Sequence, residues 1–201
     1  MSFTRLTPEE RIAEIMAAAR EVLAEVGYER FLPSEVARRC GISEASVYRY
    51  FRTKRELLTR VAEAWFEEVL AMEPGVAEHE GTYERLHYVV RYSLDVVRRS
   101  PALTRFILTE LRSDPEYRST PLYEQNRRFT GVVSQVLRDA VAAGDFRDDV
   151  TVTLLRDMIF GAIEHQTWAY LRGEGDFSVS ESAEGIARVI WRGMALPGRE
   201  R

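Results

Sequence analysis

The residue types that most often carry catalysis or metal binding are few in this sequence, and their spacing does not form a reactive site. There are three histidines, at 79, 87 and 165, and one cysteine, Cys40. Glu84 and His87 have the spacing of half a di-iron carboxylate site, but the second copy and the further glutamates are missing. No H-E-x-x-H, G-x-S-x-G, Walker A or C-x-x-C pattern occurs. We therefore expect no enzyme activity, no metal and no cofactor.

Cationic, hydroxyl and tyrosine side chains concentrate instead in one stretch. From Val36 to Arg60, seven basic residues (38, 39, 49, 52, 54, 55 and 60) stand against two acidic ones (44 and 56), which gives a local charge of +5. The whole chain has 28 basic and 32 acidic residues and a net charge of −4. A basic island suits a nucleic-acid backbone, because each phosphate that is neutralised releases condensed counterions. The alternative is a solvated helical face.

Two short helices joined by a tight turn are expected to position these side chains. Pro33 suits the first position of a helix, and Gly41 ends that helix and marks the turn. Ser43 is a good N-cap for the second helix, in which Val47 and Phe51 lie four residues apart and face inward. The pattern predicts a helix-turn-helix.

A third helix follows directly, because Thr53 and Glu56 have the spacing of a capping box.

The lone Cys40 lies on the inner face of the first short helix. We interpret it as a small buried apolar residue; the alternative is a redox sensor.

The stretch from Gly27 to Leu58, GYERFLPSEVARRCGISEASVYRYFRTKRELL, resembles the amino-terminal DNA-binding domain of the TetR family of bacterial transcriptional repressors. The motifs that carry the resemblance are Gly27-Tyr28, Val36-Ala37, Gly41-Ile42-Ser43, Val47-Tyr48-x-Tyr50-Phe51, and Lys54 followed by Glu56-Leu57-Leu58. The resemblance implies an all-α fold, a two-fold dimer, a recognition helix in the major groove, and a carboxy-terminal domain whose small ligand releases the DNA.

The resemblance also implies roles for individual side chains. Tyr48 and Tyr50 are expected at phosphates or sugars, and Lys54 is expected to pair with a phosphate. Among the exposed positions, Arg49 suits a guanine edge and Ala45 a thymine methyl group. The alternative for Arg49 is a non-specific phosphate contact. The complete predicted DNA-binding set is Ser34, Ser43, Glu44, Ala45, Ser46, Tyr48, Arg49, Tyr50 and Lys54.

One place departs from the family pattern. Family members usually have Thr or Ser at the positions held here by Phe31 and Leu32, where the hydroxyl caps the first short helix and contacts a phosphate. This chain has no hydroxyl there and begins the helix with Pro33 and Ser34. That phosphate contact is therefore not carried over.

Helical spacing of apolar residues continues through the rest of the 201 residues, without a strand pattern or an internal repeat. The first helix is predicted to begin at a capping box formed by Thr7 and Glu10, with Pro8 at its first position. After the helix-turn-helix, helices are expected to begin with Thr82 as a cap, at Pro101, at Pro121, with Asp148 or Asp149 as a cap, and at about Ser180. The predicted fold is all-α, with about nine helices. Its divisions are a helix-turn-helix DNA-binding domain at 1–52, a connecting helix at 53–72, and a helical ligand-binding and dimerisation domain at 73–201.

The last two predicted helices, about 150–171 and 180–194, are those through which the family forms a four-helix dimer interface. Gly161, Ala162 and Ala169 would permit close approach of a second helix, and Ile190 with Trp191 would cross the two-fold axis. The alternative is that these faces cover the core of the monomer. The resemblance favours the homodimer.

A ligand pocket is predicted among interleaved aromatic and polar residues of the carboxy-terminal domain; the alternative is that these aromatic residues belong to the core. Residues 158–165, MIFGAIEH, look like the corresponding helix of family members that answer to fatty acyl compounds. The hypothesis is a small hydrophobic effector of the fatty acyl-CoA type. The candidate ligand-binding set is Tyr88, Arg91, Tyr92, Phe106, Arg128, Phe129, His165, Gln166 and Trp168.

We therefore predict a cytoplasmic, ligand-responsive repressor that a hydrophobic effector releases from a palindromic operator of double-stranded DNA. No apolar run reaches a membrane span, and the first residues lack the apolar stretch of a signal peptide, so no membrane partner is expected. The alternative is a helical ligand-binding or interaction protein without DNA binding. The intact basic helix-turn-helix argues against it.

Overall fold

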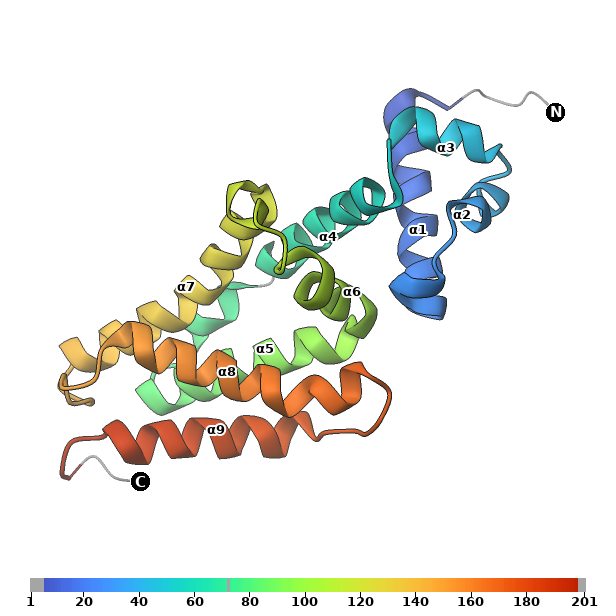
Figure 1. Ribbon diagram of the computed structural model, residues 1–201. Coiled ribbons are helices and arrows are strands. Elements are labelled where there is room, and N and C mark those ends of the chain that lie inside the picture. Colours follow the sequence, from blue (N-terminus) through green and yellow to red (C-terminus); the bar gives the residue numbers. More distant parts are fainter. Residues whose placement is uncertain (1–5, 72, 199–201) are drawn as a thin grey trace. The chain divides into compact units, whose positions relative to one another are not determined.

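The computed structural model describes residues 6–71 and 73–198, and the regular structure of this part of the chain is helical (Figure 1). Its nine α-helices are α1 (Pro8–Arg30), α2 (Pro33–Arg39), α3 (Glu44–Tyr50), α4 (Lys54–Ala71), α5 (Thr82–Arg99), α6 (Pro101–Phe106), α7 (Pro121–Ala142), α8 (Val152–Leu171) and α9 (Val179–Met194). Three short segments lie between them: η1 (Glu73–Glu78), η2 (Ile107–Leu111) and η3 (Tyr117–Ser119). The predicted all-α fold is confirmed. Within the residues described, no helix is both long and apolar enough for a bilayer.

The chain folds into two compact units. The first unit contains α1, α2, α3, the part of α4 up to Glu67, and the later segment Ala102–Leu122. The second unit runs from Glu68 to Pro101 and resumes at Tyr123, so that it contains η1, α5, α8, α9 and most of α7. The helix α4 therefore begins in the first unit and ends in the second.

Local hydrogen bonds explain where the helices of the first unit begin. Thr7 and Glu10 form the predicted capping box of α1, with the Glu10 amide donating to Thr7 Oγ1 over 3.2 Å. Gly27 has φ +73°, a left-handed value that interrupts α1 near its end and that glycine adopts without strain. Leu32 precedes α2 without a side-chain cap, as its missing hydroxyl requires.

The turn of the helix-turn-helix is also set by short polar contacts. Ser43 Oγ accepts the Ser46 amide over 3.2 Å and so caps α3, as predicted. At α4 the Glu56 amide donates to Thr53 Oγ1 over 3.0 Å, but the Glu56 carboxylate accepts from the Arg52 amide, one residue earlier than a capping box places it.

The segment from Ala102 to Leu122 is part of the first unit through named contacts. The ring of Phe106 lies 4.9 Å from that of Tyr28, and Arg105 pairs with Glu29 over 2.6 Å. Arg55, in the first turn of α4, donates from Nη2 to the Glu110 carbonyl and to Asp114, over 2.7 Å in each case. Residues far along the chain are therefore joined to the end of α1 and the start of α4.

The core of the second unit lies between α5, α7, α8 and α9, and Figure 1 shows α5, α8 and α9 running side by side. Its fully buried side chains include Leu86, Val90, Leu94, Leu137, Ile159, Ala183 and Ala187. The residues of α5 and of α9 in this set recur every four positions, which places them on one face of each helix.

Two predicted caps in the second unit are wrong. The N-cap of α8 is Thr151, whose hydroxyl accepts the Leu154 amide, because Asp149 is held by Arg147 over 3.0 Å. Thr82 is the first residue of α5 and not its cap, because its hydroxyl donates to Asp145 over 2.6 Å.

Candidate nucleic-acid interface and ligand pocket

The helix α3 presents one polar face. Val47 is buried, and residues 43, 44, 45, 48 and 49 are exposed, with Tyr48 at 43%. Ser46 and Tyr50 are partly buried, and Ser34 is exposed on the first turn of α2. Hydroxyl, phenol and guanidinium groups therefore lie along seven residues of helix, a set of donors suited to phosphate oxygens and base edges.

Three side chains on this face form a short row of hydrogen bonds. Ser43 Oγ and Ser46 Oγ are 2.8 Å apart, and Arg49 Nη2 donates to Ser46 Oγ over 3.3 Å. No carboxylate within the described part of the chain pairs with Arg49. Its charge is therefore available to a nucleic acid.

Lys54 joins the start of α4 to the end of α1. Its Nζ donates to the Tyr28 carbonyl over 2.5 Å and lies 4.3 Å from the centre of the Tyr28 ring. A cation in the first turn of a helix opposes the helix dipole, and the carbonyl and the ring face offset that cost. An ammonium has three donors, so the predicted phosphate contact stays compatible with this position.

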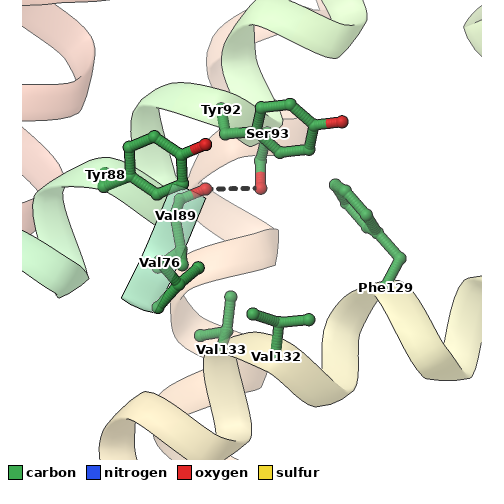
Figure 2. Close-up of a pocket in the computed structure, with 8 residues that line it drawn as sticks. All are labelled: Val76, Tyr88, Val89, Tyr92, Ser93, Phe129, Val132 and Val133. Atoms are coloured by element: carbon green, nitrogen blue, oxygen red, sulfur yellow. Dashed lines mark hydrogen bonds between the residues drawn. The ribbon is translucent and has the colours of Figure 1, made fainter. Parts of the chain in front are cut away.

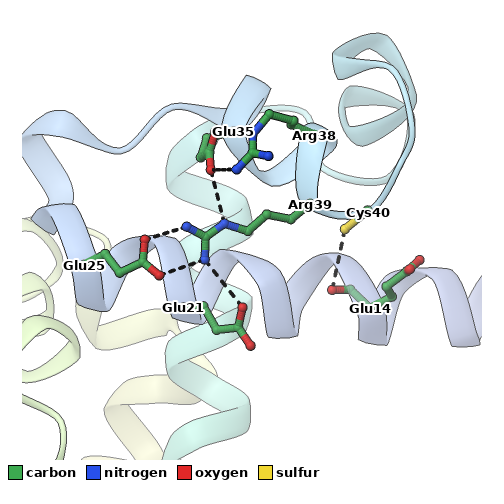
Figure 3. Close-up of polar contacts among 7 residues, drawn as sticks. All are labelled: Glu14, Glu21, Glu25, Glu35, Arg38, Arg39 and Cys40. Carbon is green, nitrogen blue, oxygen red and sulfur yellow. Dashed lines mark hydrogen bonds and ion pairs between the residues drawn. The ribbon is translucent and has the colours of Figure 1, made fainter.

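Arg38 and Arg39 are held by carboxylates, as Figure 3 shows. Arg39 on α2 pairs with Glu25 over 2.5 Å and Glu21 over 3.5 Å on α1, and with Glu35 over 3.2 Å. Arg38 pairs with Glu35 over 2.6 Å. The two guanidinium groups lower the pKa of Glu35 to about 2. Arg39 therefore fixes α2 against α1.

Only some of the basic residues between Val36 and Arg60 are thus available to bind a nucleic acid. Arg38, Arg39 and Arg55 are paired with acids that lie outside residues 36–60. Arg52, in the turn between α3 and α4, is exposed, and its guanidinium has no partner among the residues described. Sequence reasoning omitted Arg52 from the site because a row of basic residues does not reveal which of them are paired.

This difference predicts opposite effects on the salt dependence of DNA binding. Arg52→Gln should reduce the slope of log affinity against log salt by about 1, as expected for a phosphate contact. Arg39→Gln should leave that slope unchanged and lower the melting temperature, because Arg39 positions α2. Anisotropy titrations at four salt concentrations measure both slopes. A reduced slope for Arg39→Gln would show that the ion pairs of Arg39 break when the protein binds DNA.

Cys40, the residue directly after α2, lies beside Glu14 of α1 (Figure 3). Cys40 is 9% exposed, its Sγ lies 3.8 Å from the Glu14 carbonyl oxygen, and burial raises the pKa of its thiol. These contacts fit the interpretation as a buried apolar residue.

The second unit contains a small apolar hollow that is partly open to solvent (Figure 2). Its lining comes from η1, α5 and α7 and consists of Val76, Tyr88, Val89, Tyr92, Ser93, Phe129, Val132 and Val133. None of these side chains is charged. The Ser93 hydroxyl donates to the Val89 carbonyl over 2.8 Å, so its donor is already used.

The pocket lies along a row of aromatic rings. The rings of Tyr88 and Tyr92 are 6.2 Å apart and inclined by 11°, and Phe129 lies 6.1 Å from Tyr92. His79 extends the row at one end, 4.8 Å from Tyr88, and Phe160 at the other, 6.1 Å from Phe129. An apolar ligand in this pocket would therefore contact ring faces and valine methyl groups.

The structure brings three of the nine ligand candidates together, namely Tyr88, Tyr92 and Phe129. Phe106 belongs to the first unit, where it packs on Tyr28. The remaining candidates do not line the hollow: Arg91, which is exposed and 3.9 Å from Asp95, the exposed residues Arg128, His165 and Gln166, and the partly buried Trp168. The four valines and Ser93 were missed because valines at helical spacing indicate core.

A second exposed surface follows α8 and α9. Leu154 and Met158 on α8 are 53% and 51% exposed, and Val189 on α9 is 71% exposed. The small exposed residues Gly161, Ala162, Ala169, Gly185 and Gly193 continue these two stripes. A Cβ atom at any of the three glycines would meet nothing within 4 Å. The fold of this chain alone therefore does not require glycine there, although glycine costs a helix about 1 kcal/mol.

Ile190 and Trp191 do not belong to this surface, so their predicted place at a two-fold axis is wrong. They are 7% and 6% exposed and belong to the core of the second unit. Trp191 packs against Phe146 and Tyr83, with ring centres 5.4 and 5.7 Å away. Val189 is the large apolar residue of α9 that faces outward.

Two family models match parts of this chain. Residues 15–61 match the model of bacterial regulatory proteins, tetR family, and residues 79–194 match that of the tetracyclin repressor-like C-terminal domain. The fatty acid metabolism regulator protein of Bacillus subtilis strain 168 is 22% identical over 182 residues, 90% of this chain and 94% of that protein.

Solved structures share the fold. The transcriptional regulator FadR from Bacillus subtilis in complex with stearoyl-CoA has a TM-score of 0.74 at 22% identity, over 90% of this chain and 98% of that one. A protein of unknown function from Rhodococcus sp. RHA1 has a TM-score of 0.80 at 20% identity, over 98% of this chain and 100% of that one.

Proposed function

The chain belongs to the TetR family of bacterial regulatory proteins and is a ligand-responsive DNA-binding regulator of transcription, and we propose that a long-chain fatty acyl-CoA releases it from a palindromic operator as a homodimeric, cytoplasmic repressor. Among the proteins that it resembles, one is a fatty acid metabolism regulator and another is a transcriptional regulator. The effector, the dimer and the operator each rest on a separate observation.

The observation that carries the proposed effector is the uncharged lining of the pocket. Its eight side chains offer valine methyl groups and aromatic faces, and the Ser93 hydroxyl is already hydrogen bonded. Each CH₂ group that such a lining takes from water contributes about 0.8 kcal/mol. An acyl chain is therefore the part of the ligand that this pocket suits, and the charged coenzyme would stay outside it.

The proposed dimer is supported by the stripe of apolar and small residues along α8 and α9. Two copies of this stripe, one from each protomer, would form an isologous four-helix interface. Glycines with open space beyond them would let the helices of the partner approach closely. Exposed Met158 and Val189 would then be buried.

The proposed operator contact uses α3 in the major groove, in two half-sites related by the symmetry of the dimer. Arg49, whose guanidinium lies on the exposed face beside Ser46, is the candidate for base readout. Tyr48, 43% exposed on the same face, is the candidate for a phosphate or sugar contact.

These two roles predict different results for two alanine variants. Tyr48→Ala should weaken binding to all duplexes alike, whereas Arg49→Ala should change which bases are preferred, at a cost of about 1–3 kcal/mol on the best sequence. Selection of bound duplexes from a randomised pool measures the preference. An unchanged preference in Arg49→Ala would assign Arg49 to the phosphate backbone.

The experiment that tests the proposed function is a fluorescence-anisotropy titration of the purified protein. DNA from just upstream of its own gene is compared with a scrambled duplex at two salt concentrations, with and without stearoyl-CoA. We expect preferential, salt-dependent binding of two protomers per site, and release on addition of stearoyl-CoA. Preferential binding that stearoyl-CoA and shorter acyl-CoA esters leave unchanged would overturn the proposed effector.

A further inference from the structure

Tyr92 belongs both to the pocket wall and to the end of α4. Its hydroxyl donates to the Val69 carbonyl over 2.6 Å. Val69 lies in the last turn of α4 (Lys54–Ala71), where carbonyl oxygens have no amide partner within the helix. Tyr92 therefore satisfies an acceptor that the helix itself leaves open.

The ring of the same residue lines the hollow. It lies between the ring of Tyr88, 6.2 Å away, and that of Phe129, 6.1 Å away (Figure 2). A phenol ring and its hydroxyl move as one rigid group. A ligand that shifts the ring by about 1 Å along the direction of the bond would stretch it past the range of a hydrogen bond.

We propose that Tyr92 couples occupancy of the pocket to DNA binding: an acyl chain that displaces its ring breaks the hydrogen bond to Val69 and frees the last turn of α4. This inference rests on the proposed effector. The helix α4 begins in the first unit, which carries the helix-turn-helix, and ends at this bond in the second. Val76, which also lines the pocket, follows α4 by five residues. The short stretch of chain between them is therefore a second connection between the pocket and the last turn of α4.

The size of the effect follows from linkage. A ligand shifts an equilibrium between two states only by the difference in its interactions with them, and the same factor applies to DNA and to ligand. We assume that the hydrogen bond is intact in the DNA-bound protein and broken in the ligand-bound protein. Its net contribution to the free energy then sets a factor of roughly 2- to 12-fold between the operator affinities without and with ligand. Removing the hydroxyl should remove that factor.

The test compares Tyr92→Phe with Tyr88→Phe. Both variants keep the stacked rings, and both remove one hydroxyl from the same pocket. Tyr88 is the matched control, because its hydroxyl has no hydrogen bond to any residue that the structure describes. The quantity measured is the operator dissociation constant with saturating stearoyl-CoA divided by that without it.

We expect this ratio to fall about fivefold in Tyr92→Phe and to equal the wild-type ratio in Tyr88→Phe. The affinity of free Tyr92→Phe for stearoyl-CoA should be equal to or higher than that of the wild type, because the ligand no longer has to break a bond. A Tyr92→Phe ratio equal to that of the wild type overturns the coupling and leaves the proposed effector intact. A wild type that does not bind stearoyl-CoA overturns both.

Hydrogen exchange provides a second readout that needs no DNA. Stearoyl-CoA should speed amide exchange in the peptide that spans the end of α4 in the wild type and in Tyr88→Phe. In Tyr92→Phe the same peptide should exchange quickly without ligand. Slow exchange in that variant would show that the Tyr92 hydroxyl does not hold the turn, and would overturn the inference.

Discussion

Val189→Glu is expected to convert the protein from a dimer to a monomer and to weaken binding to a palindromic operator by about 10²–10⁴-fold. The side chain is 71% exposed in the single chain, on the apolar stripe that α8 and α9 share. Burying a carboxylate there against its own symmetry mate would place two like charges in an apolar interface. A monomer binds each half-site separately and loses the gain from simultaneous binding.

The matched control is Ser180→Glu. It introduces the same carboxylate at an exposed position of the same helix, nine residues earlier and therefore on the opposite side of it. Ser180→Glu should keep the wild-type melting temperature within the small range of surface substitutions, whereas Val189→Glu should melt at a lower temperature because it loses the stability that association of the protomers adds. Sedimentation velocity gives the mass of each. A Val189→Glu protein that sediments as a dimer would place the interface on another surface.

The helix-turn-helix was predictable from sequence because its signals are local. Pro33, Gly41 and Ser43 set helix ends through their own backbone or the next three amides, so the bounds of α2 and α3 follow from neighbouring residues. The inward positions of Val47 and Phe51 follow from a spacing of four. Nothing distant in the chain competes with these choices.

Predictions were less accurate where a distant residue takes part. Threonine is a common N-cap residue, but the hydroxyl of Thr82 donates to Asp145, which lies 63 positions further along the chain. Arg39 counts among the seven basic residues of the stretch, but Glu21 and Glu25 of the preceding helix pair with its charge. The grouping of residues 102–122 with the first unit depends in the same way on Arg55 and Asp114, whose pairing no local pattern encodes.

The pocket was the least predictable part, because pocket and core use the same residues. Val132 and Val133 have the helical spacing of core valines, and nothing in the sequence says that a hollow lies beside them. Tyr88, Tyr92 and Phe129 were found because aromatic and polar residues interleave in this part of the sequence. Arg91 and Arg128 were included for a charge that the lining does not use.

Val132→Phe is expected to abolish the response to acyl-CoA while DNA binding persists, which would give a repressor that is not released. Val132 is a partly buried residue of α7 that lines the hollow. A phenyl ring there occupies space that the acyl chain requires. Excluding a few methylene groups at about 0.8 kcal/mol each should weaken stearoyl-CoA binding on the order of 10²-fold.

The control for this prediction is Val141→Phe, the same substitution at a partly buried position of α7 that packs on the core outside the pocket. Overpacking costs about 1–3 kcal/mol of stability in either variant, so a general loss of stability should affect both alike. Calorimetric titration with stearoyl-CoA then separates them: Val141→Phe should bind as the wild type does, and Val132→Phe should not. Operator affinity within about threefold of the wild type would confirm that Val132→Phe remains folded, since that difference is below 1 kcal/mol. Wild-type affinity of Val132→Phe for stearoyl-CoA would mean that the acyl chain does not enter the hollow between η1, α5 and α7.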